Sequence, residues 1–403
     1  MKMNSRRKKS RRSKRRTSRK LSSRKKKRVS RHSRSTKQIK RSCKRYYVSR
    51  LKELNPSILR ESLERVVPCE WVEVLPSQYK DYQYDSVRSN YLDFLFQDGE
   101  KSDNDLYKLL TKVRGRLNAE AIANKGNLHR LLNQYGQRDL IAYTDVYDHS
   151  SRPNFRKYDK SFPTTKWIWR PSSGWSGRGV HVVSSSQELE YLWSSFQRQK
   201  YNKADQILVS KYIDNPLLLA GYKFHIRMYL IVKVDTNTSE LSAAFVRHGK
   251  IIRSKEPYVK RDYRNPNIHD THAKYNIPLR FPEDFPREYN PDDIYSSMLN
   301  AVSIATSIGS DPRIKKLGID PIDVYPEESG KKTIGFEMFG CDFMVDDTGK
   351  VYLIEINKKP GFDSPEEMML HLSRYLFTTV SELVYSKKKG YTYASPVTIR
   401  HIN

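Results

Sequence analysis

Residues 336–357 read FEMFGCDFMVDDTGKVYLIEIN, and this stretch decides the fold that we expect. Two largely apolar runs, Phe336–Val345 and Lys350–Asn357, flank Asp346-Asp347-Thr348-Gly349, a sequence typical of a hairpin turn. The two runs are therefore predicted to be neighbouring antiparallel strands.

Three polar side chains of this hairpin are expected to share one face. A loop of two or four residues places Asp342 opposite or diagonal to Glu355, within about 5–8 Å. Asn357 projects from the same face, whereas Glu337 lies on the other and is expected to be structural. With no basic residue between them on that face, these groups require a cation, and hard oxygen donors favour Mg²⁺ held together with phosphates. The alternative is two ordinary surface acids, which apolar strands make costly.

The segment Lys223–Val234 alternates between apolar and polar residues, which predicts a strand with two different faces. Its polar face carries Lys223, His225 and Arg227 in succession, about 7 Å apart along the strand. Like charges at that distance repel unless an anion lies across them. The strand therefore either exposes this face to solvent or presents it to an anionic ligand.

A third segment, Pro171–Gly179, is a turn rich in Gly and Ser between the predicted strands Lys166–Arg170 and Val180–Ser184. Such a turn either only connects a hairpin or lays backbone N–H groups over phosphates. It matches neither the Walker A pattern nor the dinucleotide-binding fingerprint. Together with the two preceding segments, it supplies what ATP-dependent phosphoryl transfer without a P-loop requires.

Further helix and strand signals complete an expected α/β (α+β) fold. Ser185 and Glu188 form a capping box, and Asn290-Pro291-Asp292-Asp293 opens a helix that runs to about Ile308. The other expected elements are a strand near Glu70–Leu75, helices over 104–113 and 118–134, a strand over Ile207–Ile213, and a helix from Ser364 to about Lys387–Lys389. Arg152–Thr165 is polar and contains two prolines, which indicates a linker or a boundary.

Five segments, in this order and spacing, resemble the tubulin-tyrosine ligase-like family, a branch of the ATP-grasp enzymes. The resemblance runs from about Lys166 to Pro360, about half of the chain, with a weaker likeness around Asn124–Leu128. The segments are Trp169-Arg170-Pro171 with Gly177-Arg178-Gly179, Lys211–Leu218, Gly221–Arg227, Phe336–Asp342, and Glu355-Ile356-Asn357 with Pro360.

The resemblance implies an ATP-grasp fold with the nucleotide between two lobes. In such enzymes ATP activates a carboxylate as an acyl-phosphate, which an amine then attacks. The implied nucleotide ligands are Lys211, Tyr212 and Ile213 for adenine, Lys223 and His225 for adenosine, Arg170, Gly177, Arg178 and Gly179 for the phosphates, and Thr271. The implied magnesium ligands are Asp342, Glu355 and Asn357, and the implied catalytic residues, which stabilise the transferring phosphoryl group, are Arg227 and Arg253.

Three positions depart from the family pattern. Arg170 replaces the usual lysine, His225 stands where aspartate is usual, and His272 stands where asparagine is usual. The first change keeps the charge, although arginine and lysine are not equivalent, whereas the second removes a charged acceptor. An active ligase and an eroded ATP-grasp body are both consistent with these changes, and the intact magnesium ligands favour the ligase.

The charge of the chain is concentrated near its N-terminus. The 403 residues carry a formal net charge of +30, and 25 of the 75 basic residues, with no acidic residue, lie in the first 50. We expect residues 1–45 to be a disordered tail, because a like-charged segment with little to bury cannot form a core. The tail is a solubilising arm, a nuclear address, or an arm that binds nucleic acid or an acidic protein.

Four parts are expected behind this tail: an N-terminal α/β domain over 46–165, a central ATP-grasp lobe over 166–233, a C-terminal lobe with the metal site over 234–390, and a tail over 391–403. No stretch approaches the roughly 18–20 apolar residues of a membrane span, and the N-terminus lacks the apolar region of a secretory signal. The three cysteines, Cys43, Cys69 and Cys341, lack a disulfide or zinc spacing, which favours a reducing intracellular compartment.

The leading functional hypothesis is an ATP- and Mg²⁺-dependent ligase that joins free glutamate, tyrosine or glycine to an acidic protein tail, with tubulin as the expected acceptor. Lys358 and Lys359 beside the site suit an acidic substrate. The competing hypotheses are an eroded ATP-grasp protein that binds microtubules or nucleic acid, and a ligase for a small molecule. We expect a cytoplasmic, cytoskeletal location or nuclear targeting by the tail, an origin in a eukaryote or a large DNA virus, and no membrane partner; the oligomeric state stays open.

Overall fold

The computed structural model describes residues 41–49, 56–73, 94–97, 113–172, 179–198, 206–269, 278–325, 332–358, 360, 366–386 and 390–400. Residues 1–40 of the predicted tail and 104–112 of the predicted helix lie outside the described residues. The last residues of both predictions are described and belong to strands instead: 41–45 to β1 (Arg41–Ser49) and Val113 to β4 (Val113–Arg114). Among the described helices, none has both the length and the apolar character needed to cross a membrane.

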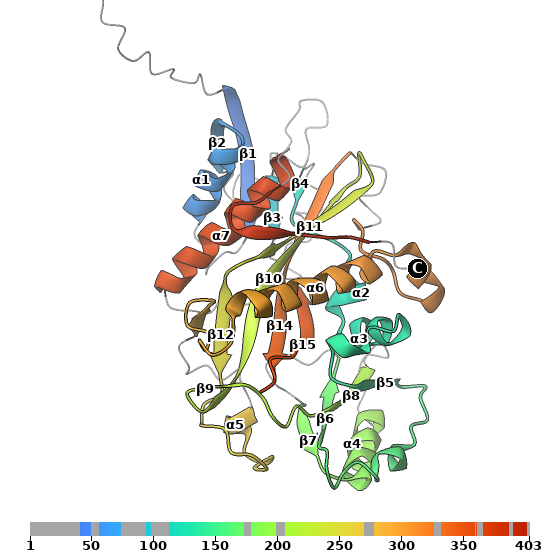
Figure 1. The fold of residues 1–403 in the computed structure, drawn as a ribbon. Coiled ribbons are helices and arrows are strands. Elements are labelled where there is room, and N and C mark those ends of the chain that lie inside the picture. The colour runs from blue at the N-terminus through green and yellow to red at the C-terminus, as the bar shows by residue number, and fades with distance from the viewer. Residues whose placement is uncertain are drawn as a thin grey trace, which may run out of the picture. The chain divides into compact units, whose positions relative to one another are not determined.

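The larger of two β-sheets has twelve strands and contains the predicted hairpin (Figure 1). Its main path runs β13 (Leu279–Phe281), β12 (Gly249–Arg253), β10 (Tyr222–Asp235), β14 (Ile334–Val345), β4 (Val113–Arg114), β3 (Phe94–Gln97), β1 (Arg41–Ser49) and β2 (Cys69–Glu73). Off this path, β11 (Glu240–Val246) pairs with β10 and with β16 (Ala394–Val397), β15 (Val351–Lys358) pairs with β14, and β9 (Leu218–Leu219) pairs with β10. The strands within residues 41–114 thus continue the sheet of the hairpin, through parallel pairing of β4 with β14.

The smaller sheet has four strands, in the order β5 (Thr144–Asp148), β8 (Gln206–Lys211), β6 (Trp167–Pro171) and β7 (His181–Val183). Helix α4 (Ser186–Arg198) contributes Leu189 and Phe196 to the core of this sheet. The strands and the helix predicted for this region are confirmed. The Ser185 hydroxyl accepts from the Glu188 backbone N–H at 3.2 Å, as the capping box requires.

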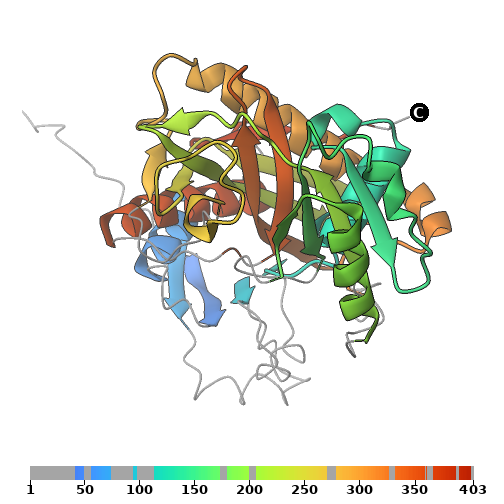
Figure 2. The ribbon, with the colours of Figure 1, turned by 90° about the horizontal axis from the view of Figure 1, so that it is seen from below.

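Helices cover both faces of the large sheet, as Figure 2 shows. Helix α6 (Pro291–Gly309) shares a core with one face, and α7 (Glu366–Tyr385) and α1 (Pro56–Val66) share a core with the other. Helix α6 begins as predicted, because the Asn290 side chain accepts from the Asp292 backbone N–H at 3.0 Å. The short helical elements are α5 (Pro266–His269) and 3₁₀ turns over Arg138–Leu140, Phe155–Tyr158 and Pro312–Leu317.

Strand β10 is buried on both faces, so of the two alternatives for its polar face, exposure to solvent is excluded. Its apolar residues belong to the core that includes α6. On the opposite face, Tyr229 and Ile231 belong to the core that includes α7. The three predicted cationic side chains on this face are 5–9% exposed: Lys223, His225 and Arg227. Because charged groups are rarely buried without partners, these side chains point to a site inside the protein.

The single helix predicted over 118–134 is instead two helices, α2 (Glu120–Ala123) and α3 (Lys125–Gln134). Asn124 between them has an extended backbone, and its side chain accepts from the Asn127 backbone N–H at 3.1 Å. Because Asn124 caps the start of α3, the chain cannot continue α2 through this residue. The periodicity of apolar residues alone did not reveal this break.

The linker predicted over Arg152–Thr165 is packed structure. Phe155, Tyr158 and Phe162 are 2–6% exposed and belong to the core of the four-stranded sheet. The prediction was wrong because it weighed the prolines and polar residues above three aromatic residues at helical spacing. The smaller sheet is therefore covered by this segment as well as by α4.

A glycine is required where β12 meets β10. A Cβ atom at Gly249 would lie 2.4 Å from the Arg227 carbonyl oxygen, and this backbone oxygen belongs to a paired strand that cannot easily shift. We expect Gly249→Ala to lower the free energy of unfolding by about 1–3 kcal/mol through overpacking, measured by chemical denaturation. Gly390→Ala is the control, because its Cβ would meet nothing within 4 Å. Equal stability of the two variants would contradict the close contact.

Candidate active site

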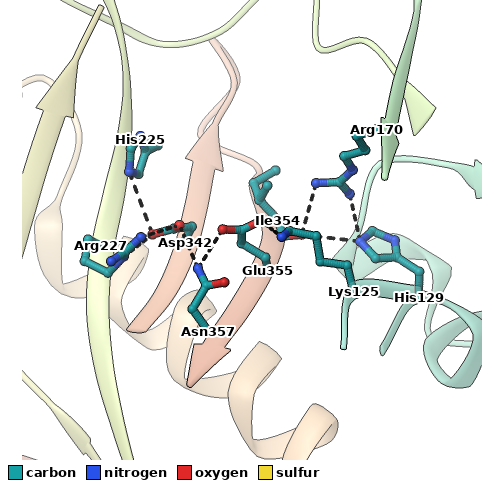
Figure 3. Close-up of polar contacts among 9 residues, drawn as sticks. All are labelled: Lys125, His129, Arg170, His225, Arg227, Asp342, Ile354, Glu355 and Asn357. Carbon is teal, nitrogen blue, oxygen red and sulfur yellow. Dashed lines mark hydrogen bonds and ion pairs between the residues drawn. The ribbon is translucent and has the colours of Figure 1, made fainter. Parts of the chain in front are cut away.

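The hairpin of β14 and β15 brings the three predicted magnesium ligands together (Figure 3). Asp342 pairs directly with Glu355, and Gly340 pairs with Asn357. The Asn357 amide nitrogen donates to Glu355 Oε1 at 2.6 Å and lies 3.4 Å from Asp342 Oδ2. Asp342 is 3% exposed, so it is not an ordinary surface acid. The predicted register and the predicted shared face are both confirmed.

A bulge follows this cluster on β15. Pairing continues from Asp342–Glu355 to Phe343–Leu353, which leaves Ile354 without an opposite residue. The carbonyl oxygen of Ile354 instead lies 3.4 Å from Arg170 Nη1, a donor from the smaller sheet. Bulges commonly redirect groups beside functional sites, and here the bulge joins the hairpin to the other sheet.

Both carboxylates of the cluster have cationic partners. Arg227 lies opposite Asp342 in the register of β10 and β14 and donates to both of its oxygens, with Nη2 at 2.7 Å from Oδ2. Burial disfavours the guanidinium charge, but Asp342 outweighs this effect and raises the pKa of Arg227. Lys125 Nζ lies 3.2 Å from Glu355 Oε2. The sequence analysis expected no basic residue among these groups, but it considered the hairpin alone. The two cationic partners come from other elements, Arg227 from β10 and Lys125 from α3.

Arg170 is held by a neutral histidine. Its Nη2 lies 2.9 Å from His129 Nε2, and because a guanidinium can only donate, this ring nitrogen is the acceptor. Burial, followed by the nearby Arg170 charge, lowers the pKa of His129 to about 3. The imidazole therefore stays neutral at physiological pH and fixes the direction of the Arg170 side chain (Figure 3).

A cavity of about 570 Å³ lies between the two sheets, next to this cluster. Strands β6, β7 and β8 line it on one side, and β10, β14 and β15 line it on the other. Eight residues predicted from the sequence are among its lining residues: Arg170, Lys211, Tyr212, Ile213, Lys223, His225, Asp342 and Glu355. The structure thus joins the adenine, phosphate and metal segments of the prediction around one cavity.

Seven other predicted residues are not among its lining residues, and four of these seven are described: Gly179, Arg227, Arg253 and Asn357. Gly177, Arg178 and Thr271 lie outside the described residues, as does His272. Gly179 is described and has a positive φ of 75°, which a glycine adopts without strain. Arg253 lies on β12 opposite Phe224, with its guanidinium 5.2 Å from the ring centre of Tyr222.

A chain of hydrogen bonds forms the wall of the cavity at the predicted adenine segment. Lys223 Nζ donates to the Tyr212 hydroxyl at 3.0 Å, and this hydroxyl contacts His269 Nδ1 at 2.7 Å. His269 Nε2 lies 2.6 Å from the Asp262 carbonyl oxygen, so Nε2 carries the proton and Nδ1 accepts. Burial lowers the pKa of Lys223 to about 8, which the nearby Asp214 opposes.

Among the polar contacts described above, three residues had not been predicted as site residues: Lys125, His129 and His269. Lys125 falls in the segment that showed a weak family likeness, which was the available signal. His129 follows it by one turn of α3, so it faces the same side of the helix. His269 opens the stretch 269–272, from which the family resemblance singled out Thr271, so the signal was present but pointed to another residue.

Lys358 does not stand free beside the site. Its Nζ lies 2.9 Å from Glu120 Oε1 on α2, and Lys359 lies outside the described residues. The pairing with Glu120 removes part of the support for Lys358 as a contact for an acidic substrate.

The fold is that of an ATP-grasp enzyme. The structure matches the C-terminal domain of *K. lactis* Pby1, described as an ATP-grasp enzyme interacting with the mRNA decapping enzyme Dcp2, with a TM-score of 0.58 and 19% identity. The match covers 89% of this chain and 99% of the other. At this identity the likeness concerns the fold alone.

A model of the tubulin-tyrosine ligase family matches residues 116–390, about two thirds of the chain, and the chain belongs to this family. It is 26% identical over 260 residues to a protein of *Schizosaccharomyces pombe* named "Probable tubulin--tyrosine ligase", covering 55% of this chain and 59% of that one. It is 26% identical over 235 residues to a *Tetrahymena thermophila* protein named "Probable alpha-tubulin polyglutamylase", covering 55% and 54%. The chain thus spans a little over half the length of these two relatives.

The neutral His129 predicts a loss of stability in acid. The unfolded chain binds a proton on this residue near pH 6.5, whereas the folded protein does so only near pH 3. Between these two pH values the unfolded state therefore binds more protons than the folded state, and the free energy of unfolding should fall as the pH drops. At pH 5 the loss of unfolding free energy that is due to His129 should be about 2 kcal/mol.

Denaturation from pH 7 to pH 4 tests this expectation. His129→Gln keeps an acceptor for Arg170 but cannot take up a proton, so its stability should decline less steeply. His181→Gln, at an exposed histidine of β7, is the control. The same slope in wild type and His129→Gln would show that the imidazole is not buried as described.

Proposed function

We propose that this chain is an ATP- and Mg²⁺-dependent ligase that joins an amino acid through an amide bond to an acidic protein tail, with tubulin as the acceptor. The observation that carries the proposal is the convergence of Asp342, Glu355 and Asn357, of which the two carboxylates line the cavity between the two sheets. Membership of the tubulin-tyrosine ligase family supports the reaction class, and an ATP-grasp fold in general implies ATP and Mg²⁺.

The charges around the cavity suit a triphosphate. Arg170, Arg227 and Lys125 bring three cationic groups close to the two carboxylates. This excess of positive charge favours an anionic ligand. A nucleoside triphosphate with one Mg²⁺ remains anionic and brings the metal that the carboxylates require.

The donor set fits magnesium. Two carboxylates and one carboxamide supply hard oxygen atoms, and an oxygen that accepts from Arg227 or Lys125 keeps a second lone pair for a cation. The amide orientation of Asn357 follows from its hydrogen bonds and reverses by rotation about one bond. Asp342, Glu355 and Asn357 would hold the ion, which would supply charge stabilisation for the transferring phosphoryl group.

The protein side chains would bind and orient the reactants. Lys211–Ile213 would contact adenine, and the bond from Lys223 would hold Tyr212 in place there. Arg170, aimed by His129, would contact the phosphates. Arg227 donates to Asp342, which lines the cavity, and its guanidinium would stabilise the charge that develops on the phosphoryl group.

The proposed reaction has two steps, formation of an acyl-phosphate and formation of the amide. A carboxylate oxygen of the acceptor attacks the γ-phosphorus of ATP, and ADP leaves. The amine nitrogen then attacks the carbonyl carbon of the acyl-phosphate, the phosphate leaves, and the nitrogen loses a proton as the amide forms. The two relatives are named for tyrosine and for glutamate, and other proteins that match the chain are named for glycine, so the proposal covers all three amino acids.

A second candidate is an eroded ATP-grasp body that binds a partner without catalysis. The observation that favours it is the Arg227–Asp342 pair, which already satisfies both oxygens of the carboxylate. In that case the pair would be structural, and neither metal nor nucleotide would bind at the cavity. Nucleotide binding separates the two candidates.

Removal of one metal ligand tests the ligase. Glu355→Ala should weaken Mg²⁺-dependent ATP binding by about 100-fold or more, because loss of even an outer-shell partner costs 10–100-fold in metal affinity. Calorimetry measures the binding, and transfer of labelled Glu, Tyr or Gly to tubulin measures the reaction. Glu120→Ala is the matched control, because Glu120 also pairs with a lysine but does not line the cavity.

Two results would contradict the proposal. Unchanged ATP binding in Glu355→Ala would remove the metal assignment. A wild type that does not bind ATP with Mg²⁺ would favour the eroded body, in which Arg227 and Asp342 form a structural pair.

A further inference from the structure

Helix α5 places His269 in the wall of the cavity, and contacts within the protein hold it there. The backbone N–H groups of Lys255 and Glu256, just after β12, donate to the Asn267 carbonyl oxygen at 3.0 Å and 3.1 Å. The Glu256 carboxylate in turn accepts from the Asn267 side-chain amide at 2.7 Å. The Tyr263 ring lies parallel to the imidazole to within 12°, with 6.2 Å between the ring centres. The short helix is therefore docked beside the end of β12, and its histidine has a defined position.

The imidazole of His269 gives the hydrogen bonds of this wall a direction. Because Nε2 donates to the Asp262 carbonyl oxygen, Nδ1 of the neutral ring carries a lone pair. Burial, helped by the nearby Lys223 charge, lowers the pKa of His269 and keeps the ring neutral. The Tyr212 hydroxyl, 2.7 Å from Nδ1, therefore donates to this nitrogen, and its oxygen accepts from Lys223 Nζ at 3.0 Å.

The Lys223 ammonium group keeps donors for a ligand. An ammonium group has three N–H donors, and the bond to Tyr212 is the one hydrogen bond that this side chain makes within the part of the chain that the structure describes. Lys223 is 5% exposed and lines the cavity. Because a buried cation is costly unless it has partners, a bound ligand that accepts from the remaining N–H groups is favoured at this place.

We propose that His269 is a positioning residue for the nucleotide and that it acts through Tyr212 on Lys223. Since Nδ1 takes the proton of the Tyr212 hydroxyl, the lone pair of this hydroxyl faces Lys223 and holds the ammonium group, whose other N–H groups would contact the adenosine part of the nucleotide. Without an acceptor at position 269, the hydroxyl proton is free to turn toward Lys223, and two donors that face each other repel. This inference rests on the ATP binding of the proposed function.

Two substitutions of His269 replace its two ring nitrogens separately. His269→Asn keeps an oxygen acceptor near the place of Nδ1, which serves Tyr212, whereas His269→Gln puts an amide donor near the place of Nε2, which serves Asp262. Calorimetry of ATP with Mg²⁺ on the full chain should show that His269→Asn binds nearly as tightly as wild type. His269→Gln should bind about tenfold more weakly, which is the effect of one lost hydrogen bond.

A double-mutant cycle tests whether His269 acts through Tyr212. Tyr212→Phe removes the hydroxyl and should weaken ATP binding by a similar factor. The double variant with His269→Gln should bind no more weakly than Tyr212→Phe alone, because both changes break the same chain of hydrogen bonds. His248→Gln is the control, since His248 pairs with Glu283 and is not among the lining residues of the cavity, and it should leave the affinity unchanged.

The outcomes separate this inference from the function on which it rests. If wild type binds ATP and Glu355→Ala does not, but His269→Asn binds as weakly as His269→Gln, then His269 only docks α5, and the inference is overturned while the proposed function stands. Additive losses in the double variant would overturn the action through Tyr212 in the same way. If wild type does not bind ATP with Mg²⁺, both are overturned.

A measurement on wild type alone keeps the test independent of the folding of a variant. Nuclear magnetic resonance of the full chain labelled with ¹⁵N-histidine reports which ring nitrogen carries the proton. His269 should be neutral with its proton on Nε2, as the bond to the Asp262 carbonyl oxygen requires. A proton on Nδ1 would overturn the proposal, because the imidazole would then have no acceptor for the Tyr212 hydroxyl.

Discussion

The pairing of Arg227 with Asp342 is the interaction on which the rest of the site depends. A carboxylate at 3% exposure in the middle of a sheet is unfavourable by itself, and removal of one partner from such a buried pair typically costs about 3–5 kcal/mol. The register of β10 and β14 sets the two residues opposite each other. Glu355 and Asn357 then follow from the register of β14 and β15, so the ion pair stabilises the carboxylate around which the two strand registers gather the cluster.

The cavity is assembled from parts of the chain that are far apart in sequence. The large sheet supplies the carboxylates, and the small sheet supplies Arg170 and the segment Lys211–Ile213. Helix α3 connects the two, because Lys125 contacts Glu355 while His129 contacts Arg170. The bulge at Ile354 gives a further direct contact. Movement of one sheet relative to the other would therefore alter the cation arrangement and the carboxylate cluster together.

Features set by local sequence were predictable, and features set by tertiary packing were not. The turn Asp346–Gly349 and the alternation on both sides determine the hairpin, so its register and shared face followed from the sequence. The family resemblance placed the adenine and phosphate segments around one cavity. The pairing of the two carboxylates with Arg227 and Lys125 was not predicted, because these cations lie on another strand and on a helix. The break at Asn124 and the buried aromatic residues of 152–165 were missed because capping and packing outweigh average polarity.

Strand β1 bears on how this protein can be shortened. Composition sets the end of the basic tail at residue 45, but β1 begins at Arg41, and its first half pairs with β2 from Cys69 to Val72. A chain cut at residue 45 would leave the backbone groups of β2 exposed, and such open strand edges promote association between molecules. Aggregation of such a truncated chain could then be attributed wrongly to the loss of the positive charge of the tail. A truncation that ends before Arg41 keeps β1 whole, so a change in its behaviour reports on the tail alone.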